Sequence, residues 1–548
     1  MPTINVKKSD LERLVNMDLS DAFIEEKFPM MGVEVEEIFK EDCEKVVQFS
    51  INPNRPDYLS VEGLARGFRG FIGIETGLKR YDVYESDIKI YVEDVKTRPY
   101  IAFALVKNVQ IDDAVLESII NLQEKLHWTI GRDRKKVAIG IHDADKVESP
   151  FYYKEVDEDG IKFIPLNAEE EMTPKEILEK HEKGIKYAHL INDRFPIILD
   201  KNGNVLSMPP IINGILTKVT TETRNLLIDV TGTDKNAVEN TLNIIVTALA
   251  DRGGTIFKTE VIYKDEKITY PNLEPKIKET TPEFINKTLG LNLNVGEIVS
   301  CLRKGRMDSI YENGRLKIFI PPYRVDILHE VDFAEEVAIN YGYDKFTGEY
   351  PIIGTIGEVN KLEKKCDFIR EIMIGLDFYE VVNLTLSNQK ILFENMRLDV
   401  DEKDYIEVLK PASVEHRVVR TSILPLLLET LRINKHKELP QRIFEIGDCV
   451  VIDENFETRG RTIKKIAGVV IHPTANFNEI KSYVEALLRE LKINYELESY
   501  KHPSFIDGRC AKIISNGKGI GCFGEIHPEV ILNFDLEHPI VGFEIEIE

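Results

Sequence analysis

The chain has 548 residues, of which 43% are hydrophobic and 30% are charged. This composition excludes a disordered, collagen-like or low-complexity protein, and the length suggests about three to four domains. The 94 acidic and 71 basic residues give a formal net charge of −23. Such a charge repels phosphate backbones at long range, so any nucleic-acid contact must come from a local basic patch or from a partner.

Cysteine usage and the absence of apolar runs indicate a cytoplasmic protein. The cysteines form no Cys-x-x-Cys pair and no zinc-ligand spacing, which predicts reduced and mostly buried thiols. They are Cys43, Cys301, Cys366, Cys449, Cys510 and Cys522. The N-terminus has no signal-peptide core, and no stretch approaches the roughly 20 uncharged residues of a membrane span.

Residues 1–85 are predicted to mix short strands with two helices. Ser9 and Glu12 have the spacing of a capping box, which predicts that the first helix begins there. In residues 51–58, INPNRPDY, two prolines deny helix to the residues before them, so a rigid turn is predicted before the second helix. Arg55 between these prolines leaves a ligand-binding loop open as an alternative.

Residues 86–265 alternate strand-like and helical patterns, which predicts a self-contained α+β domain. The expected strands are residues 100–109, 137–143 and 225–233, and the expected helices are residues 114–126 and 237–249. His142, Asp143 and Asp145 resemble a metal-hydrolase fragment, although no second histidine stands at a fixed spacing. The basic clusters at residues 132–136 and 303–306 could meet phosphates or form a solvated face.

A proline-punctuated linker at residues 271–275 leads to a small helical domain that ends near residue 347. Thr281-Pro282 predicts a helix start and Gly290 a helix stop, while Asn313-Gly314 predicts a tight hairpin. The last 200 residues are predicted to form one antiparallel sheet flanked by helices. Its expected strands are residues 381–386, 441–444, 466–471 and 540–546, and the glycine-rich residues 517–525 are predicted to turn between strands.

The densest carboxylate cluster lies in residues 321–344. Asp332, Glu335 and Glu336 stand at i, i+3 and i+4 of a predicted helix, so they share one face, and Asp326 stands six residues upstream. Hard oxygen ligands of this kind suit Mg²⁺. From the residues alone, a capping box of Asp332 with Glu335 is favoured over a metal site.

Four segments in order give the chain a resemblance to a known family. They are residues 51–67 (INPNRPDYLSVEGLARG), 321–344 (PPYRVDILHEVDFAEEVAINYGYD), 420–448 and 521–546. This sequence resembles the β subunits of phenylalanyl-tRNA synthetases, in their archaeal and eukaryotic form. The resemblance implies a multi-domain α+β protein: an N-terminal α/β module (1–85), an α+β editing domain (86–265), a small helical, winged-helix or DNA-binding-like module (270–347) and a class II synthetase-like antiparallel sheet domain without catalysis (348–548).

The family attaches phenylalanine to tRNA-Phe with ATP, in an α₂β₂ enzyme whose aminoacylation site lies on the α subunit. The resemblance therefore implies an α subunit and tRNA-Phe as partners, Mg²⁺ at Asp326, Asp332, Glu335 and Glu336, and hydrolysis of mischarged Tyr-tRNA-Phe. Proofreading is physically reasonable, because a phenylalanine pocket rejects an added hydroxyl only modestly. The implied editing residues are Ser207, Asn213, Asp229 and Thr231, and the implied tRNA contacts are Gln123, Glu124 and Arg134.

One observation independently supports a loss of catalysis in the last domain. A working class II synthetase uses an Arg-x-Glu to clamp ATP, and here the residue two before Glu445 is Ile443. Residues 517–525 also lack the arginine of the later motif. The rival interpretation is a non-catalytic, Mg²⁺-dependent RNA-binding scaffold of synthetase-like fold.

Overall fold

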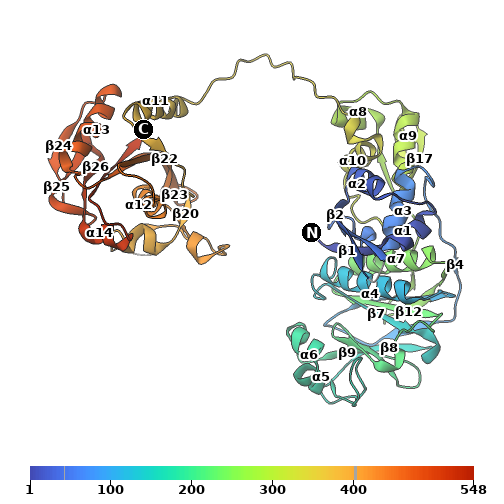
Figure 1. The fold of residues 1–548 in the computed structure, drawn as a ribbon. Helices are drawn as coiled ribbons and strands as arrows, with labels where there is room; N and C mark the ends of the chain where they lie inside the picture. Colours follow the sequence, from blue (N-terminus) through green and yellow to red (C-terminus); the bar gives the residue numbers. More distant parts are fainter. Residues whose placement is uncertain (42–43, 400–403, 548) are drawn as a thin grey trace. The chain divides into compact units, whose positions relative to one another are not determined.

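A computed structural model describes residues 1–41, 44–399 and 404–547. The chain divides into two compact units, Met1–Glu349 and Tyr350–Glu548 (Figure 1). Each unit is described by itself.

The first unit holds helices α1 to α10 and strands β1 to β18. The helices are α1 Lys8–Val15, α2 Asp21–Met30, α3 Val61–Phe71, α4 Asp113–Trp128, α5 Pro174–Lys180, α6 Glu182–Tyr187, α7 Lys235–Asp251, α8 Pro282–Leu289, α9 Val295–Lys304 and α10 Glu330–Tyr341. The strands are β1 Thr3–Lys7, β2 Glu34–Glu41, β3 Glu44–Ser50, β4 Val83–Tyr84, β5 Lys89–Val92, β6 Tyr100–Lys107, β7 Val137–Asp143, β8 Phe151–Val156, β9 Phe195–Leu199, β10 Val205–Met208, β11 Ile212–Asn213, β12 Leu226–Gly232, β13 Thr255–Phe257, β14 Thr259–Ile262, β15 Lys267–Tyr270, β16 Lys276–Thr280, β17 Asp308–Glu312 and β18 Arg315–Ile320.

The second unit holds helices α11 to α14 and strands β19 to β27. The helices are α11 Lys361–Gly375, α12 Leu424–Ile433, α13 Phe477–Glu490 and α14 Pro528–Asn533. The strands are β19 Tyr379–Glu380, β20 Leu386–Ser387, β21 Val418–Val419, β22 Gln441–Ile452, β23 Gly460–Ile471, β24 Glu496–Ser499, β25 Phe505–Ser515, β26 Lys518–Ile526 and β27 Ile540–Ile547.

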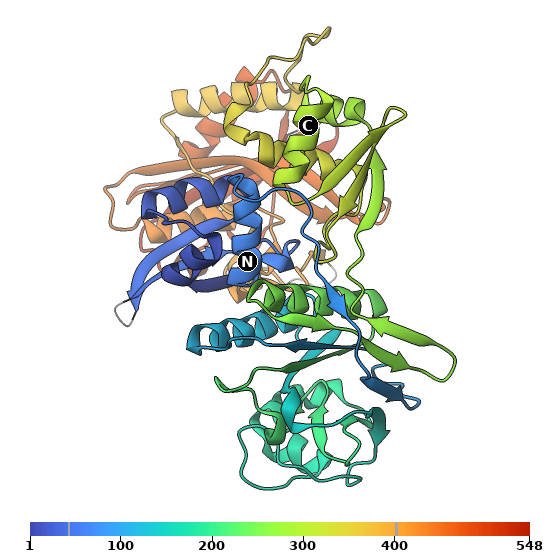
Figure 2. The ribbon, with the colours of Figure 1, turned by 90° about the vertical axis from the view of Figure 1, so that its right-hand side faces the viewer.

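Two sheets packed face to face form the middle of the first unit. One has five strands in the order β4-β13-β6-β12-β7, and the other has seven in the order β11-β10-β9-β8-β5-β14-β15. Phe103 of the first stacks on Phe151 of the second, with ring centroids 5.9 Å apart. Helices α4 and α7 cover the other face of the five-stranded sheet (Figure 2). Because β7 ends this sheet, its outer edge needs other hydrogen-bond partners.

The N-terminal three-stranded sheet, in the order β1-β3-β2, carries helices α1 to α3. The expected capping box at Ser9 is wrong, because α1 already begins at Lys8 and the Ser9 hydroxyl instead donates to Glu44. The strand β1 runs directly into this helix and leaves no room for a cap at Ser9. The rigid turn at residues 51–58 followed by a helix is confirmed by α3, which begins after a capping serine.

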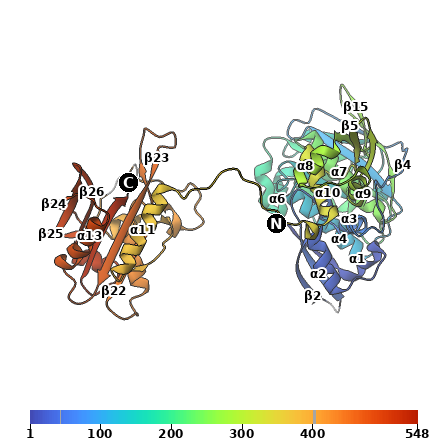
Figure 3. The ribbon, with the colours of Figure 1, turned by 90° about the horizontal axis from the view of Figure 1, so that it is seen from above.

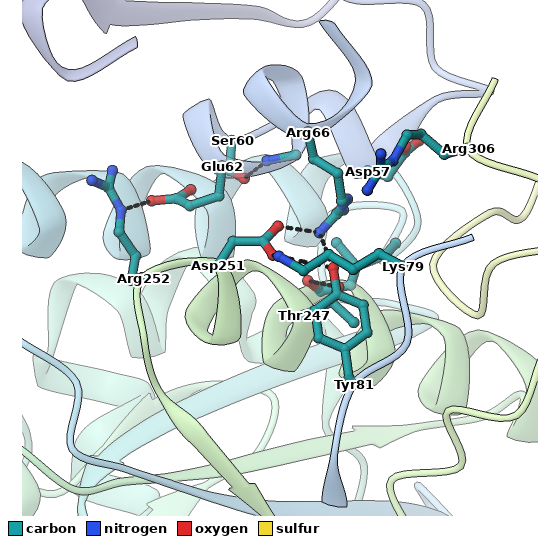
Figure 4. A network of polar contacts seen from close by, with 12 residues as sticks. Asp57, Ser60, Glu62, Arg66, Lys79, Tyr81, Thr247, Asp251, Arg252 and Arg306 are labelled. Atoms are coloured by element: carbon teal, nitrogen blue, oxygen red, sulfur yellow. Dashed lines mark hydrogen bonds and ion pairs between the residues drawn. The ribbon is translucent and has the colours of Figure 1, made fainter. Parts of the chain in front are cut away.

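Buried ion pairs tie this N-terminal part to α7 (Figure 4). Arg252 Nε lies 2.6 Å from Glu62 of α3, and its Nη2 lies 2.6 Å from Asp10 of α1. Asp251 receives Arg66 of α3 at 2.6 Å. One hydrophobic cluster also runs through both parts. These contacts join residues 1–85 and 86–265 in one packed unit.

The small module consists of helices α8 to α10 and the sheet β16-β18-β17. Residues recognised in the sequence mark several of its element boundaries. The Thr281 hydroxyl accepts the Phe284 N–H at the start of α8, and Gly290 ends that helix with a left-handed φ of 68°. Asn313 and Gly314 turn between β17 and β18 with φ values of 51° and 78°. All three predictions are confirmed, because each residue type suits the backbone conformation at its position.

The second unit is a seven-stranded sheet in the order β19-β22-β23-β27-β26-β25-β24, antiparallel except for the β19–β22 pair. Its interior strand β23 alternates between faces: Ala467 and Val469 pack with α12 and α14, while Ile466 and Val470 pack with α11 and α13. Figure 3 shows α11 alongside these strands. The predicted antiparallel sheet flanked by helices is thus confirmed, apart from its edge strand.

Two predictions within this unit are wrong. Residues 381–386 form no strand apart from Leu386 at the start of β20, and residues 518–526 form the strand β26 rather than a turn. The glycines of β26 fit because neighbouring backbone comes close: a Cβ on Gly521 would lie 2.3 Å from the Glu544 carbonyl oxygen.

Two composition-based expectations can also be compared with the described residues. The cysteines there carry free thiols, four of them buried, while Cys43 lies outside the described residues. Among the helices of the described residues, none combines the length and apolar character needed to cross a membrane.

Candidate functional site

A cavity of about 350 Å³ lies at the outer edge of β7. Its walls come from α4, from β7 and from the hairpin β10–β11 with the turn that follows. The apolar lining includes Leu116, Ile119, Ile120, Ile139, Ile141, Pro209, Pro210, Ile211 and Ile212. The polar lining is Gln123, Glu124, Asn167, Arg134, Lys183, Ser207, Asn213, Thr217, Lys218 and Asp229. A mostly apolar cavity of this size with a few polar groups is typical of a small-molecule site.

Helix α4 closes the edge of β7 with two side chains. The Ile139 N–H donates to Nε2 of His127 at 2.8 Å, and Gln123 Nε2 donates to the Ile139 carbonyl at 2.8 Å. Burial lowers the pKa of His127 to about 4, so the ring is neutral at pH 7 and can accept this bond. Both outward backbone groups of Ile139 are therefore satisfied, and the cavity has a fixed floor.

Arg134 fastens the opposite wall. Its guanidinium donates to the carbonyl oxygens of Pro210 and Ile211 at 3.2 and 2.9 Å, and to Glu124 at 2.9 Å. It also lies 4.7 Å from the ring centroid of Tyr187. Contact with His127, and then the charge of Arg134, lower the pKa of Glu124 despite burial, so this carboxylate is ionised. Arg134 is only 5% exposed.

An unusual turn delivers Arg134 to this position. Three consecutive non-glycine residues, Arg132, Asp133 and Arg134, have left-handed φ values of 48°, 53° and 66°. L-residues adopt this conformation at a cost, and rarely in a row. The contacts of Arg134 offset that strain. Most of the basic cluster at residues 132–136 remains accessible, but Arg134 itself is committed to the cavity wall.

Ser207 and Asp229 face the cavity with unused hydrogen-bonding capacity. The Ser207 hydroxyl is buried and has no partner within the described part of the chain. Asp229, on the fully buried strand β12, accepts a bond on Oδ2 only, so its Oδ1 has no protein partner among the described residues. Ser207 pairs with Asn213 across the hairpin β10–β11. Gly140 leaves room for Asp229, because a Cβ there would lie 2.0 Å from Asp229 Oδ2.

Thr231 lies two residues along β12 and outside the cavity lining. Arg98 holds it, with Nε 3.3 Å from the Thr231 hydroxyl and Nη2 2.9 Å from its carbonyl oxygen. Of the seven residues expected for editing and tRNA contacts, the structure thus brings six to one cavity and leaves Thr231 outside its lining.

The expected metal carboxylates are near one another but have protein partners. Arg324 donates to both oxygens of Asp326, at 2.8 and 2.6 Å, and to Glu336 at 2.5 Å. Burial raises the pKa of Asp326, but Arg324 outweighs it and holds the pKa below its ordinary value. Asp332 Oδ2 accepts two backbone N–H groups at the start of α10, including that of His329 at 2.6 Å. Asp332 therefore caps the helix, as its third residue rather than its first, so the expected box with Glu335 is wrong.

Of these four carboxylates, Glu335 is the one that has no hydrogen bond or ion pair within the described part of the chain. Burial and the charges of Glu336, Asp326 and Asp332 raise its pKa. The structure shows no convergence of three or more metal-ligating side chains among the described residues. The donor chemistry nevertheless fits a hard cation on the Glu335 side, where Asp332 Oδ1 and both Glu335 oxygens have no protein partner in the described part of the chain.

The turn at residues 51–58 packs against this cluster. Arg55 donates to both oxygens of Asp57, at 3.0 and 2.9 Å, and lies 3.8 Å from Glu336. Its guanidinium also covers the ring of Tyr58 at 3.6 Å. These internal contacts favour the structural interpretation of Arg55 over a ligand-binding loop.

Known proteins match this chain from end to end. Family models match residues 1–73 (Phe-tRNA synthetase beta subunit B1 domain), 89–247 (B3/4 domain), 278–343 (tRNA synthetase B5 domain) and 349–547 (Phenylalanyl tRNA synthetase beta chain CLM domain). A phenylalanine–tRNA ligase beta subunit of Methanocaldococcus jannaschii is 74% identical over the whole of both chains. One of Archaeoglobus fulgidus is 45% identical over all of this chain and 98% of its own. The chain belongs to the phenylalanine–tRNA ligase β-subunit family.

A solved structure supports the fold of the first unit of this family member. An N-terminal fragment of the phenylalanyl-tRNA synthetase β subunit from Pyrococcus horikoshii matches with a TM-score of 0.61 and 44% identity, over 62% of this chain and 99% of the fragment. The expected family resemblance, of the archaeal type, is confirmed.

In this β subunit, Glu445 has an internal partner. Its carboxylate receives Arg420 at 2.6 Å and the Asn383 side chain at 2.7 Å, and it is 2% exposed. Ile443, two residues before Glu445, is also buried. The glutamate is thus neutralised by a residue of the same chain.

Sequence reasoning missed Thr217 of this β subunit as a cavity residue and His142 as the partner of Asp229. His142 bonds to Asp229, whereas Asp143 accepts from Thr223 and Asp145 from Asn225. The three residues of the supposed metal-hydrolase fragment therefore have separate partners. Alternation along β7 could have placed His142 beside Gly140 on one face, but no pattern pointed to Thr217.

Proposed function

We propose that this β subunit joins an α subunit in an α₂β₂ ligase of the cytoplasm, and that its cavity hydrolyses mischarged Tyr-tRNA-Phe. Attachment of phenylalanine to tRNA-Phe, with ATP as substrate, takes place on the α subunit. The end-to-end family match supports the ligase role. The cavity supports the hydrolytic role, since it carries six of the seven expected residues.

The unpartnered hydroxyl of Ser207 in a mostly apolar cavity is the observation that carries the proposal. A buried polar group without a partner costs about 1–3 kcal/mol. A tyrosyl ring would place its hydroxyl within hydrogen-bond distance of the Ser207 hydroxyl or of Asp229 Oδ1, and would give that group a partner. A phenylalanyl ring would leave both unpaired, so the cavity prefers the wrong amino acid, which is what a second sieve needs.

The reaction is hydrolysis of the ester between the amino acid and the terminal ribose. A water oxygen bonds to the ester carbonyl carbon, the bond to the ribose oxygen breaks, and that oxygen takes up a proton. Asn213 lies beside Ser207 on the hairpin wall, and we assign Gln123, Glu124 and Arg134 to the wall that meets the tRNA terminus. Thr231, which Arg98 holds, lies outside the lining of the cavity.

We propose Mg²⁺ at Asp326, Asp332, Glu335 and Glu336. Glu335 supplies the free carboxylate, and its raised pKa reflects negative charge that a cation would neutralise. Bound there, the ion would neutralise this charge and hold α10 to the preceding segment, residues 321–329. Arg324 already binds two of the four carboxylates, so the ion would keep several waters.

We infer that the chain has four domains, at residues 1–85, 86–265, 270–347 and 348–548. The four matched family models support this division. We also propose a winged-helix-like fold for the third and a class II synthetase-like fold without catalysis for the fourth. The Arg420–Glu445 pair supports the loss of catalysis, because it neutralises a glutamate that would otherwise help to bind ATP.

Deacylation of Tyr-tRNA-Phe by the assembled α and β subunits tests the hydrolytic role. Wild type should hydrolyse the tyrosyl ester in preference to Phe-tRNA-Phe. Asp229→Ala should lower the rate at least 100-fold, because it removes a polar group of the cavity, while phenylalanine attachment stays unchanged. If wild type gives no hydrolysis, the chain is instead a structural and RNA-binding scaffold.

A further inference from the structure

We propose that His142 and Thr217 form a positioning relay that holds the Asp229 carboxylate for the hydrolytic reaction. The inference rests on the function proposed above for the cavity. His142 Nε2 lies 2.7 Å from Asp229 Oδ2, and His142 Nδ1 lies 2.7 Å from Thr217 Oγ1. All three residues are at most 1% exposed. Neither His142 nor Thr217 was expected at this site from the sequence.

The direction of the two bonds follows from their chemistry. A carboxylate only accepts, so His142 Nε2 carries a hydrogen and donates it to Asp229. We assign the Thr217 hydroxyl hydrogen to His142 Nδ1, because the other acceptor near it, the Gly214 carbonyl, lies farther away at 3.4 Å. The hydroxyl thus fixes one tautomer of the ring, and that tautomer fixes one oxygen of Asp229.

The strand register explains why the relay can form. Asp229 of β12 lies opposite Gly140 of β7, and His142 lies two residues farther along the same face. Gly140 has no side chain to fill the space between them, so the carboxylate turns toward the histidine. With Oδ2 held in this way, Oδ1 is left for the ligand.

Thr217 connects the relay to the opposite wall. It belongs to the short turn Ile215–Thr217, which follows the hairpin that carries Ser207 and Asn213. The relay therefore sets Asp229 relative to Ser207, the other polar group with free capacity. His142 and Thr217 act through Asp229 and are positioning residues rather than catalytic ones.

The test compares single-turnover deacylation of Tyr-tRNA-Phe by the assembled enzyme with matched variants. Thr217→Val keeps the shape and removes the hydroxyl, whereas Thr217→Ser keeps the hydroxyl. We expect Thr217→Val to lower the rate constant at saturating enzyme by roughly 10- to 100-fold and Thr217→Ser to restore most of it. His142→Gln, which can still donate but cannot fix a tautomer, should fall between.

Thr259→Val is the control for loss of a buried hydroxyl. Its hydroxyl donates to the Phe103 carbonyl at 2.8 Å in the same domain, away from the cavity, so its rate constant should stay near that of wild type. The relay would be overturned if the rate constant of Thr217→Val stayed within twofold of wild type. It would also be overturned if Thr259→Val were as slow as Thr217→Val. Failure of the proposed function would give a distinguishable result, because wild type would then not deacylate Tyr-tRNA-Phe or Asp229→Ala would still do so.

Discussion

Several polar side chains around the cavity hold its walls rather than a ligand. Gln123 and His127 close the edge of β7, and Arg134 fastens the wall at Pro210. Ser207 and one oxygen of Asp229 keep unused capacity within the described chain. In the proposed function, selectivity for a tyrosyl ring rests on these two groups, while Gln123, His127 and Arg134 maintain the shape of the cavity.

The buried ring of His127 should make stability fall at low pH. Its pKa is about 4 in the folded chain, against an ordinary value of 6.5, so between these values the unfolded chain binds more protons. The contribution is complete above pH 6.5 and is lost as pH falls toward 4, by up to about 3 kcal/mol. Urea unfolding followed by the fluorescence of Trp128, the single tryptophan and the neighbour of His127, measures this change.

His127→Gln provides the comparison, because glutamine can accept the Ile139 N–H but does not titrate. The difference in unfolding free energy between wild type and this variant should shrink as pH falls from 6.5 to 4. A difference that is constant over this range would show that His127 titrates alike in both states.

At the scale of elements, a Mg²⁺ titration tests whether the carboxylates of α10 do more than cap that helix. Calorimetric titration of the full chain with MgCl₂ should show saturable binding, weakened about tenfold or more by Glu335→Gln. Glu283→Gln, an exposed glutamate of α8, should bind as wild type does. Absence of saturable binding by wild type, or equal affinity in Glu335→Gln, would leave Asp332 as a cap and the Arg324 ion pairs as the whole role of the cluster.

Local patterns predicted those elements whose limits depend on local backbone chemistry. Thr281 and Gly290 mark the ends of α8, because a capping hydroxyl and a left-handed glycine are needed wherever the helix packs. Ser9 misled because the chain enters α1 from β1, one residue earlier. The glycines of β26 suggested a turn, but they are needed because neighbouring strands approach the backbone closely, as at Gly521.

The cavity itself was beyond local patterns. Its walls come from α4, from β7 and from residues 207–219, which lie far apart along the chain. The family resemblance supplied Ser207, Asn213 and Asp229, but spacing alone offered no reason to group them. The relay through Thr217 also depends on a turn whose path only the fold determines.

Across the whole molecule, the two units suggest a separation of roles. The first carries the cavity, and ion pairs from Arg252 to Asp10 and Glu62 hold its N-terminal part against α7. The second holds a seven-stranded, mostly antiparallel sheet in which Arg420 neutralises Glu445. In this account the β subunit checks the product and the α subunit makes it.

The most direct test is a crystal structure of the assembled enzyme with 3′-tyrosylamino-adenosine, in which an amide replaces the labile ester. We predict the ring in the cavity of residues 89–247, with its phenolic oxygen within hydrogen-bond distance of Ser207 Oγ or Asp229 Oδ1. The phenylalanyl analogue should bind at least tenfold more weakly at this site. A tyrosyl analogue absent from the cavity at saturation, or equal occupancy by both analogues, would contradict a hydrolytic site that selects tyrosine.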